Sequence, residues 1–220
     1  DTFRELCAVR SRGGTDFTSV AGLAMPTAAG TILKTPPRSL PANLDAYPFP
    51  DRSLTRKYRS RYFYLAEKSV AALRTSFGCT HHCTFCSVRV YSKGNFIARS
   101  AEQVFEEIRS IQEEFIIFCD DHSFHDPERM RRLGQLLLDA GIKKRYFAYA
   151  RTDSIVKHRD VYALWAKAGL MLVMSGLEAL DDEALQRSGK KTSISINEEA
   201  IQIARELGFF FSAGFLIEPH

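Results

Sequence analysis

The sequence has no run of about 18 apolar residues, the length that a membrane-spanning helix needs. It also lacks the charged-then-apolar opening of a secretory signal peptide. Its net charge of +4 is too small to indicate a nucleic-acid-binding protein. From these absences we predict a cytoplasmic protein that has neither a membrane span nor a nucleic-acid partner.

The chain does not begin with methionine, and a helical pattern starts directly after Asp1. At the other end, the chain stops just after the strand-like run 209–217. We therefore expect both ends to be cuts through a longer protein.

The five cysteines are an odd number, and three of them fall within eight residues. This arrangement does not fit a framework of disulfides. In a cytosolic protein, clustered cysteines more often bind a metal or do redox chemistry.

Residues 1–58 look like the tail of a preceding domain followed by a linker. We predict a short helix over 2–10 and a hairpin of two strands, 19–25 and 31–34. Five prolines then follow between residues 36 and 50, which favours extended backbone. The basic run 56–61 is interpreted as the solvated end of this linker.

Residues 59–220 alternate between strand and helix patterns. Ser100 and Asp126 have the sequence context of helix N-caps, and glycines stand where four of the helices are expected to end. This alternation predicts an α/β fold with right-handed βαβ units and a parallel sheet. Five units followed by a stop favour a partial (βα) barrel, with ligands at the carboxyl ends of the strands. The predicted strands are 69–75, 115–119, 145–150, 170–174 and 209–217.

The segment 78–86 reads G-C-T-H-H-C-T-F-C, so Cys79, Cys83 and Cys86 have the spacing C-x3-C-x2-C. Three thiolates on one loop can bind three irons of a cubane and leave the fourth iron open to a small molecule. Two alternatives stay open on the residues alone. The cysteines could be unrelated core residues, or they could bind zinc with His81 or His82 as the fourth ligand.

The loop resembles the C-x3-C-x-aromatic-C signature of the radical S-adenosylmethionine (SAM) superfamily, with Phe85 as the aromatic residue. The resemblance covers about residues 70–219. It implies a partial barrel of the radical SAM type, and a [4Fe-4S] cluster on Cys79, Cys83 and Cys86 whose open iron binds SAM. One electron from the cluster then cleaves SAM to a 5′-deoxyadenosyl radical.

The same resemblance assigns SAM contacts at other strand ends. It implies that Asp121 lies near the SAM amino group and that Arg151 faces the SAM carboxylate. The run 175–178 resembles the family's G-L-E-S turn, so Ser175 and Glu178 are expected to reach SAM, although Ala179 replaces the last serine. Leu216 takes the isoleucine place of the G-x-I-x-G strand that packs on adenine, but a glutamate at 218 replaces the final glycine.

Residues 1–58 resemble the joint after the N-terminal cobalamin (B12) domain of one radical SAM subgroup, and the hopanoid C-3 methylases of that subgroup most of all. This resemblance implies cobalamin-dependent methylation of an unactivated carbon, with the cobalamin bound mainly by an upstream domain. The expected partners are a small-molecule substrate of lipid-like character and an electron donor such as flavodoxin or ferredoxin. Other radical SAM chemistry (a cyclase or a methylthiotransferase) and a zinc-binding structural module are the alternatives.

Overall fold

The computed structural model describes residues 1–217, and the glutamate at 218 lies outside them. The chain forms two compact units, Asp1–Ala42 and Asn43–His220. In the first unit, helix α1 (Thr2–Ser11) accompanies an antiparallel hairpin of β1 (Ala24–Pro26) and β2 (Ile32–Lys34). Both the helix and the hairpin were predicted from the sequence, but β1 is shorter than expected. Whether this unit is the end of a cobalamin-binding domain stays a prediction.

The basic segment before the sheet differs from the expected extended linker. It forms a 3-10 helix, η1 (Arg52–Arg61), which belongs to the second unit. Arg52 explains why, since it donates hydrogen bonds to the carbonyl of Ala72 at 3.0 Å and to the carboxylate of Glu107 at 2.8 Å. The segment is therefore helical rather than extended, because Arg52 and Arg59 find buried partners that lie far along the chain. Residues 56–58, 60 and 61 are exposed, as the solvated interpretation predicted.

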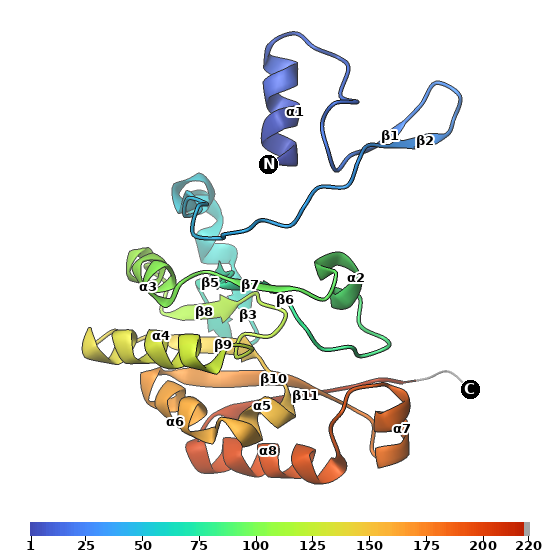
Figure 1. Ribbon diagram of the computed structural model, residues 1–220. Coiled ribbons are helices and arrows are strands. Elements are labelled where there is room, and N and C mark those ends of the chain that lie inside the picture. The colour runs from blue at the N-terminus through green and yellow to red at the C-terminus, as the bar shows by residue number, and fades with distance from the viewer. Residues whose placement is uncertain (218–220) are drawn as a thin grey trace. The chain divides into compact units, whose positions relative to one another are not determined.

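The second unit is built on a five-stranded parallel sheet, as predicted (Figure 1). Its strand order is β11-β10-β9-β8-β5, so each strand pairs with the next one along the chain. Within the described residues β5 and β11 are the two edges, which gives a partial barrel. The strands are β5 (Val70–Leu73), β8 (Phe115–Phe118), β9 (Arg145–Tyr149), β10 (Leu170–Glu178) and β11 (Phe210–Phe215).

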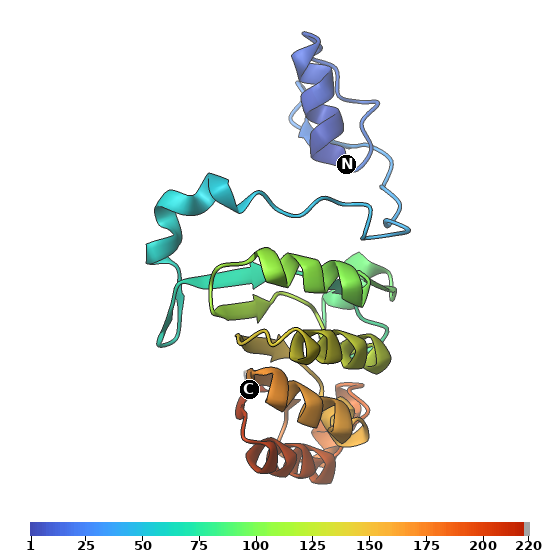
Figure 2. The same ribbon diagram turned by 90° about the vertical axis from the view of Figure 1, so that its left-hand side faces the viewer.

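Four helices cover one face of this sheet, and Figure 2 shows them stacked side by side in chain order. The first two begin where the sequence predicted, because the side chains of Ser100 and Asp126 accept hydrogen bonds from the third residue beyond each. The other two begin two and three residues before the predicted starts at 161 and 197. Consecutive right-handed crossovers place the helices on the same side. The helices are α3 (Ala101–Ser110), α4 (Pro127–Asp139), α6 (Arg159–Ala168) and α8 (Ile194–Leu207). Among the described residues no helix is both long and apolar enough to cross a membrane.

Side chains alternate between two cores across the sheet. Ile116, Phe118 and Val173 pack under the helices, where Trp165 is fully buried and donates a hydrogen bond to the carbonyl of Met130. Phe147 lies on the other face with a smaller apolar cluster. This alternation has period two, so it decides which residues of each strand can face the inside of the partial barrel.

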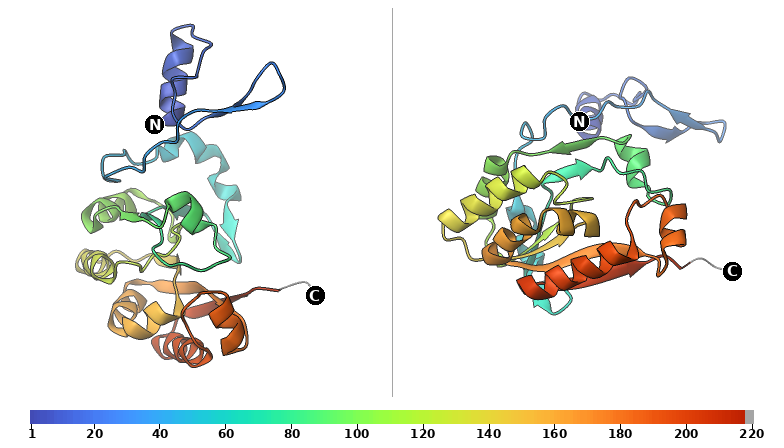
Figure 3. Two further views of the ribbon diagram at one scale, coloured as in Figure 1. Left: turned by 45° about the vertical axis from the view of Figure 1, so that its right-hand side comes forward. Right: turned by 60° about the horizontal axis from the view of Figure 1, so that its bottom comes forward.

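Shorter elements lie mostly around the ends of the strands, as Figure 3 shows from two sides. A two-stranded hairpin follows η1, and a second hairpin encloses the cysteine loop. The sequence did not predict α2, α5, β3, β4, β6 or β7, which are all six residues or shorter. The elements are β3 (Phe63–Tyr64), β4 (Glu67–Lys68), β6 (Ser76–Gly78), α2 (Val88–Ser92), β7 (Phe96–Ala98), α5 (Thr152–Lys157) and α7 (Asp182–Arg187).

Replacing Asp126 with alanine is expected to lower the free energy of unfolding by about 1 kcal/mol, because the backbone N–H of Arg129 loses its 3.0 Å acceptor. Chemical denaturation measures the loss. Asp139→Ala, at the opposite end of α4, is the control, because an acid there opposes the helix dipole and only an exposed hydrogen bond from Gln135 is lost, so the change is expected to stay below about 0.5 kcal/mol. Equal losses in the two variants would show that the cap has no special role.

Candidate functional site

The cysteine loop is carried by the hairpin of β6 and β7 rather than by the sheet itself. Gly78 ends β6 with a φ of 85°, and a Cβ at this position would collide with the carbonyl oxygen of Asn95. Only glycine fits such a left-handed and crowded position without strain. The glycine before the first cysteine therefore sets the direction in which the loop leaves the hairpin.

Two aspartates that follow β8 hold the start of this loop. Asp120 is buried and accepts hydrogen bonds from the backbone N–H groups of Thr75 and Ser76 at 2.7 and 2.8 Å. Burial raises the pKa of Asp120, although these hydrogen bonds oppose the shift. Asp121 accepts a hydrogen bond from the N–H of Gly78 at 2.8 Å. The carboxyl end of β8 thus fixes the backbone directly before Cys79.

Asp121 also joins the loop to helix α2, because its second carboxylate oxygen accepts a short hydrogen bond from the hydroxyl of Tyr91. Replacing Asp121 with alanine removes both acceptors, so we expect unfolding free energy to fall by about 1–2 kcal/mol. Tyr91→Phe removes one bond only and is the matched variant. Chemical denaturation of both single variants and of the double variant gives the coupling free energy between Asp121 and Tyr91. If the two losses of unfolding free energy simply add, the two side chains do not share a hydrogen-bond network.

A pocket of about 320 Å³ opens at the carboxyl ends of the strands, beside the cysteine loop. Its walls come from that loop, from the ends of β8, β9, β10 and β11, and from the segment after α7. The lining includes Cys79, Cys83, Cys86, Phe85, Asp121, Arg151 and Glu178.

Counted together, the three cysteines and four of the six predicted SAM contacts line this one pocket, which makes seven of the nine predicted residues.

The remaining two predicted residues, Ser175 and Leu216, are not among the residues that line the pocket. Ser175 is buried, and strand alternation places it on the side of Val173, which packs under the helices. Met174, Gly176 and Glu178 take the pocket side of β10 instead. Leu216 lies beyond the end of β11, where its N–H donates a hydrogen bond to the carbonyl of Glu178.

The three cysteines have the chemistry that an iron–sulfur cluster requires. All three are free thiols, half-buried, and line the pocket. Burial raises the pKa of the Cys79 thiol, and the neighbouring cysteines add to the shift. Arg151 opposes it, and its guanidinium lies 3.5 Å from the sulfur of Cys83. Soft thiolates beside a fixed cation fit a [4Fe-4S] cluster, because the cluster and its ligands carry net negative charge.

Arg151 is held in place by three hydrogen bonds to two groups. Its guanidinium donates hydrogen bonds to both carboxylate oxygens of Asp153, at 2.9 and 3.0 Å, and to the carbonyl of Lys190 at 2.6 Å. Such a fork-like arrangement leaves little rotational freedom. The one nitrogen that approaches Cys83 is therefore aimed into the pocket.

Lys190 is a pocket residue that the sequence analysis missed. It is 5% exposed, and its ammonium group donates hydrogen bonds to the carboxylate of Glu178 at 2.6 Å and to the carbonyl of Gly176 at 2.7 Å. Glu178 itself has a left-handed backbone with a φ of 67°. The only signal in the sequence was a lysine directly after the glycine that ends a short helix, which is too common to predict a buried ion pair.

Segment 188–190 also touches the cysteine loop. The N–H of Thr84 donates a hydrogen bond to the carbonyl of Ser188 at 2.9 Å. Because Lys190 follows two residues later, the loop between α7 and α8 connects the cysteine loop to the end of β10. The pocket is thus closed by contacts between segments about one hundred residues apart.

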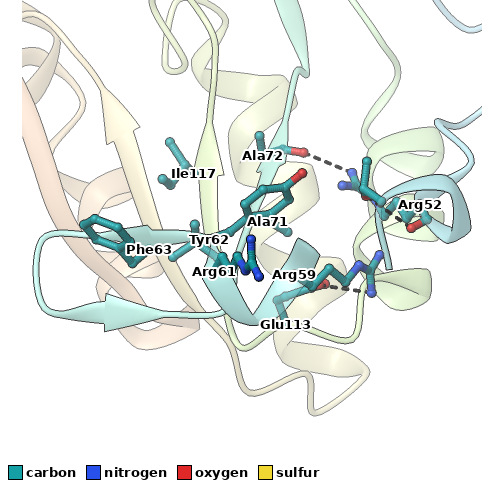
Figure 4. A pocket seen from close by; sticks show the side chains of 11 residues that line it. Arg52, Arg59, Arg61, Tyr62, Phe63, Ala71, Ala72, Glu113 and Ile117 are labelled. Atoms are coloured by element: carbon teal, nitrogen blue, oxygen red, sulfur yellow. Dashed lines mark hydrogen bonds and ion pairs between the residues drawn. The ribbon is translucent and has the colours of Figure 1, made fainter. Parts of the chain in front are cut away.

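Another hollow, of about 390 Å³, lies between η1 and strand β5 (Figure 4). Two of the three arginines that line it are already engaged, since Arg52 binds the carbonyl of Ala72 and Arg59 binds the carboxylate of Glu113 at 3.0 Å. Neither cysteine nor histidine is among the described residues that line it. The pocket beside the cysteine loop is therefore the candidate functional site.

Comparison with protein families and with known proteins agrees with this assignment. The family model described as the radical SAM superfamily matches residues 73–217. The chain is 33% identical over 184 residues to the hopanoid C-3 methylase of Methylococcus capsulatus, a match that covers 84% of this chain and 35% of that protein. It is 25% identical over 207 residues to the anaerobic magnesium-protoporphyrin IX monomethyl ester cyclase of Rubrivivax gelatinosus, covering 92% of this chain and 37% of the cyclase. The chain thus spans little more than a third of the length of these two relatives.

Among solved structures, the fold is similar to that of the cobalamin-dependent SAM radical enzyme OxsB with aqua-cobalamin and SAM bound. The TM-score is 0.80 at 20% sequence identity, and the match covers 99% of this chain and 33% of OxsB. At this level of identity, the similarity establishes the fold.

Proposed function

Because this chain belongs to the radical SAM superfamily, we propose that Cys79, Cys83 and Cys86 hold a [4Fe-4S] cluster at which SAM is reductively cleaved. When bound, the cluster supplies the electron that converts SAM into methionine and a 5′-deoxyadenosyl radical. The observation that carries the proposal is the meeting of three free thiols with fixed charges of both signs in one pocket.

The charges of the pocket match the two ends of the methionine part of SAM. Arg151 and Lys190 are cations that can bind its carboxylate, Arg151 through the one guanidinium nitrogen that is aimed into the pocket. Asp121 and Glu178 are carboxylates that can accept hydrogen bonds from its amino group and from ribose hydroxyls. Phe85 is 43% exposed and offers an apolar wall beside the cysteines. For Ser175 and Leu216 a SAM contact stays a prediction.

The test is anaerobic reconstitution with iron and sulfide, reduction with dithionite, and quantification of 5′-deoxyadenosine and methionine after SAM is added. The proposal expects both products in equal amounts. Product formation that is the same in a Cys79→Ala, Cys83→Ala, Cys86→Ala triple variant would show that the cleavage does not occur at these cysteines.

We further propose that the radical serves a cobalamin-dependent methylation of an unactivated carbon in a small, lipid-like substrate. The identity to hopanoid C-3 methylase and the cobalamin named for OxsB, whose fold this chain shares, support this choice. The cobalamin would be held mainly by parts of the protein outside this chain, and flavodoxin or ferredoxin would supply electrons. The 25% identity to the magnesium-protoporphyrin ester cyclase favours ring closure as the second candidate.

SAM with a deuterated methyl group separates these two candidates. Incubation of the complete protein with cobalamin and candidate substrates gives a product heavier by one labelled methyl group if the protein is a methylase. A cyclase gives a product that contains no label.

A further inference from the structure

Three histidines gather around Cys79, the first cysteine of the loop. His81 comes from the cysteine loop, whereas His122 and His125 come from the segment after β8. Each of the four residues offers one ligand atom, and these four atoms all lie within 4.8 Å of one another. Two segments of the chain about 40 residues apart thus bring four ligand atoms close enough to bind one metal ion.

The donors of this cluster are one thiol and three imidazoles, with no carboxylate among them. Zinc in proteins is bound by such a set of four sulfur and nitrogen donors, and ferrous iron and cobalt accept the same donors. Calcium and magnesium prefer oxygen ligands and are disfavoured here. The donor set therefore selects a divalent transition metal.

The most buried member of the cluster lacks a partner. His122 is 4% exposed, and its Nε2 atom is buried with no hydrogen-bond partner among the described residues. Leaving a buried polar nitrogen unpaired costs free energy, and a bound metal ion removes that cost. His122 also lines the candidate pocket, so an ion can reach it from solvent.

The third histidine is oriented by a neighbour from the cysteine loop. Nε2 of His125 lies 3.1 Å from the hydroxyl of Thr80, while its Nδ1 lies 3.2 Å from Nδ1 of His122. Metal-bound histidines commonly use one nitrogen as ligand and the other for an orienting hydrogen bond. Thr80 supplies that hydrogen bond, which leaves Nδ1 of His125 facing the other ligands.

We propose that Cys79, His81, His122 and His125 bind one divalent transition metal ion, zinc or ferrous iron, in the chain that carries no cluster. Binding displaces the thiol proton of Cys79 to solvent and forms a metal–sulfur bond. The site itself is independent of the proposed function. The sulfur of Cys79 cannot be a ligand of both this ion and a [4Fe-4S] cluster, so binding of the ion and assembly of the cluster exclude each other. This competition rests on the proposed function.

The experiment is a titration of the metal-free, anaerobic chain with Co²⁺, followed by competition with Zn²⁺. The proposal expects one equivalent of Co²⁺ with the visible absorption of tetrahedral coordination and a thiolate charge-transfer band. The Cys83→Ala, Cys86→Ala double variant keeps this spectrum, because neither cysteine is a ligand. The His122→Gln, His125→Gln double variant loses it, and its affinity for Zn²⁺ falls by more than the roughly 100-fold that loss of a second-shell partner costs.

The opposite pattern, with binding lost in the cysteine variant and kept in the histidine variant, overturns the proposal. His82→Ala is the matched control, because His82 belongs to the same loop but is exposed and outside the cluster. If circular dichroism shows that the double histidine variant is unfolded, His81→Ala takes its place, since His81 lies in the loop and is less buried.

Competition is measured by reconstitution with iron and sulfide after Zn²⁺ has been added. Wild type loaded with zinc is expected to assemble less cluster than metal-free wild type, and the His81→Ala variant to be less inhibited. Equal assembly in zinc-loaded and metal-free wild type refutes the exclusion. If metal-free wild type assembles no cluster at all, the proposed function fails, while the Co²⁺ titration still decides the histidine site.

Discussion

Replacing Cys83 with alanine is expected to abolish cluster assembly, so that reconstituted protein falls from about four bound irons per chain to fewer than one. The physical reason is that a cubane held by two thiolates instead of three leaves two irons open to solvent and to loss. Iron analysis and the brown visible absorption of the cluster measure the effect.

Cys119→Ala is the matched control for this substitution. Cys119 is also free and half-buried, but it is not among the residues that line the pocket. Its replacement is expected to leave the iron content unchanged. A full cluster in Cys83→Ala, or an equal loss in Cys119→Ala, would contradict the assignment of the cysteine loop.

Replacing Lys190 with alanine is expected to lower the free energy of unfolding by about 3–5 kcal/mol, because the carboxylate of Glu178 then stays buried without its cation. The side chains of the pair are 6% and 11% exposed, so water cannot take over the role of the lysine. Chemical denaturation of the cluster-free chain measures the loss.

Two further variants make this result specific. The Lys190→Ala, Glu178→Ala double variant is expected to recover much of the stability, since no buried charge is then left unpaired. Lys191→Ala changes an exposed neighbour and is expected to shift stability by less than about 0.5 kcal/mol. A loss below about 1 kcal/mol in Lys190→Ala would show that the pair is not held as the structure has it.

The parts of the fold that the sequence predicted are those set by local chemistry. Strand β8 is a continuous apolar run, and α3 and α4 begin at Ser100 and Asp126, whose side chains cap the helices next to them. Such signals lie within a few residues of the element that they define. Helix η1 was missed because its arginines are stabilised by partners that no local pattern reveals, such as Glu107 for Arg52.

The site was predicted in part for the same reason. The cysteine spacing is local, so the three thiols could be assigned from the sequence, as could Arg151 after β9. Ser175 was predicted on the assumption that the strand ends at 174, but β10 continues to Glu178, and its alternation turns Ser175 away from the pocket. Lys190 reaches the site through the loop after α7. Its contact with Glu178 depends on the tertiary structure, so no local sequence pattern predicts it.

Electron paramagnetic resonance of the reduced, reconstituted protein, recorded with and without SAM, tests the central claim most directly. An iron that is open to SAM predicts a [4Fe-4S] signal whose g values change when SAM is added. A cluster signal that is identical in both samples would contradict the proposal that SAM binds at Cys79, Cys83 and Cys86.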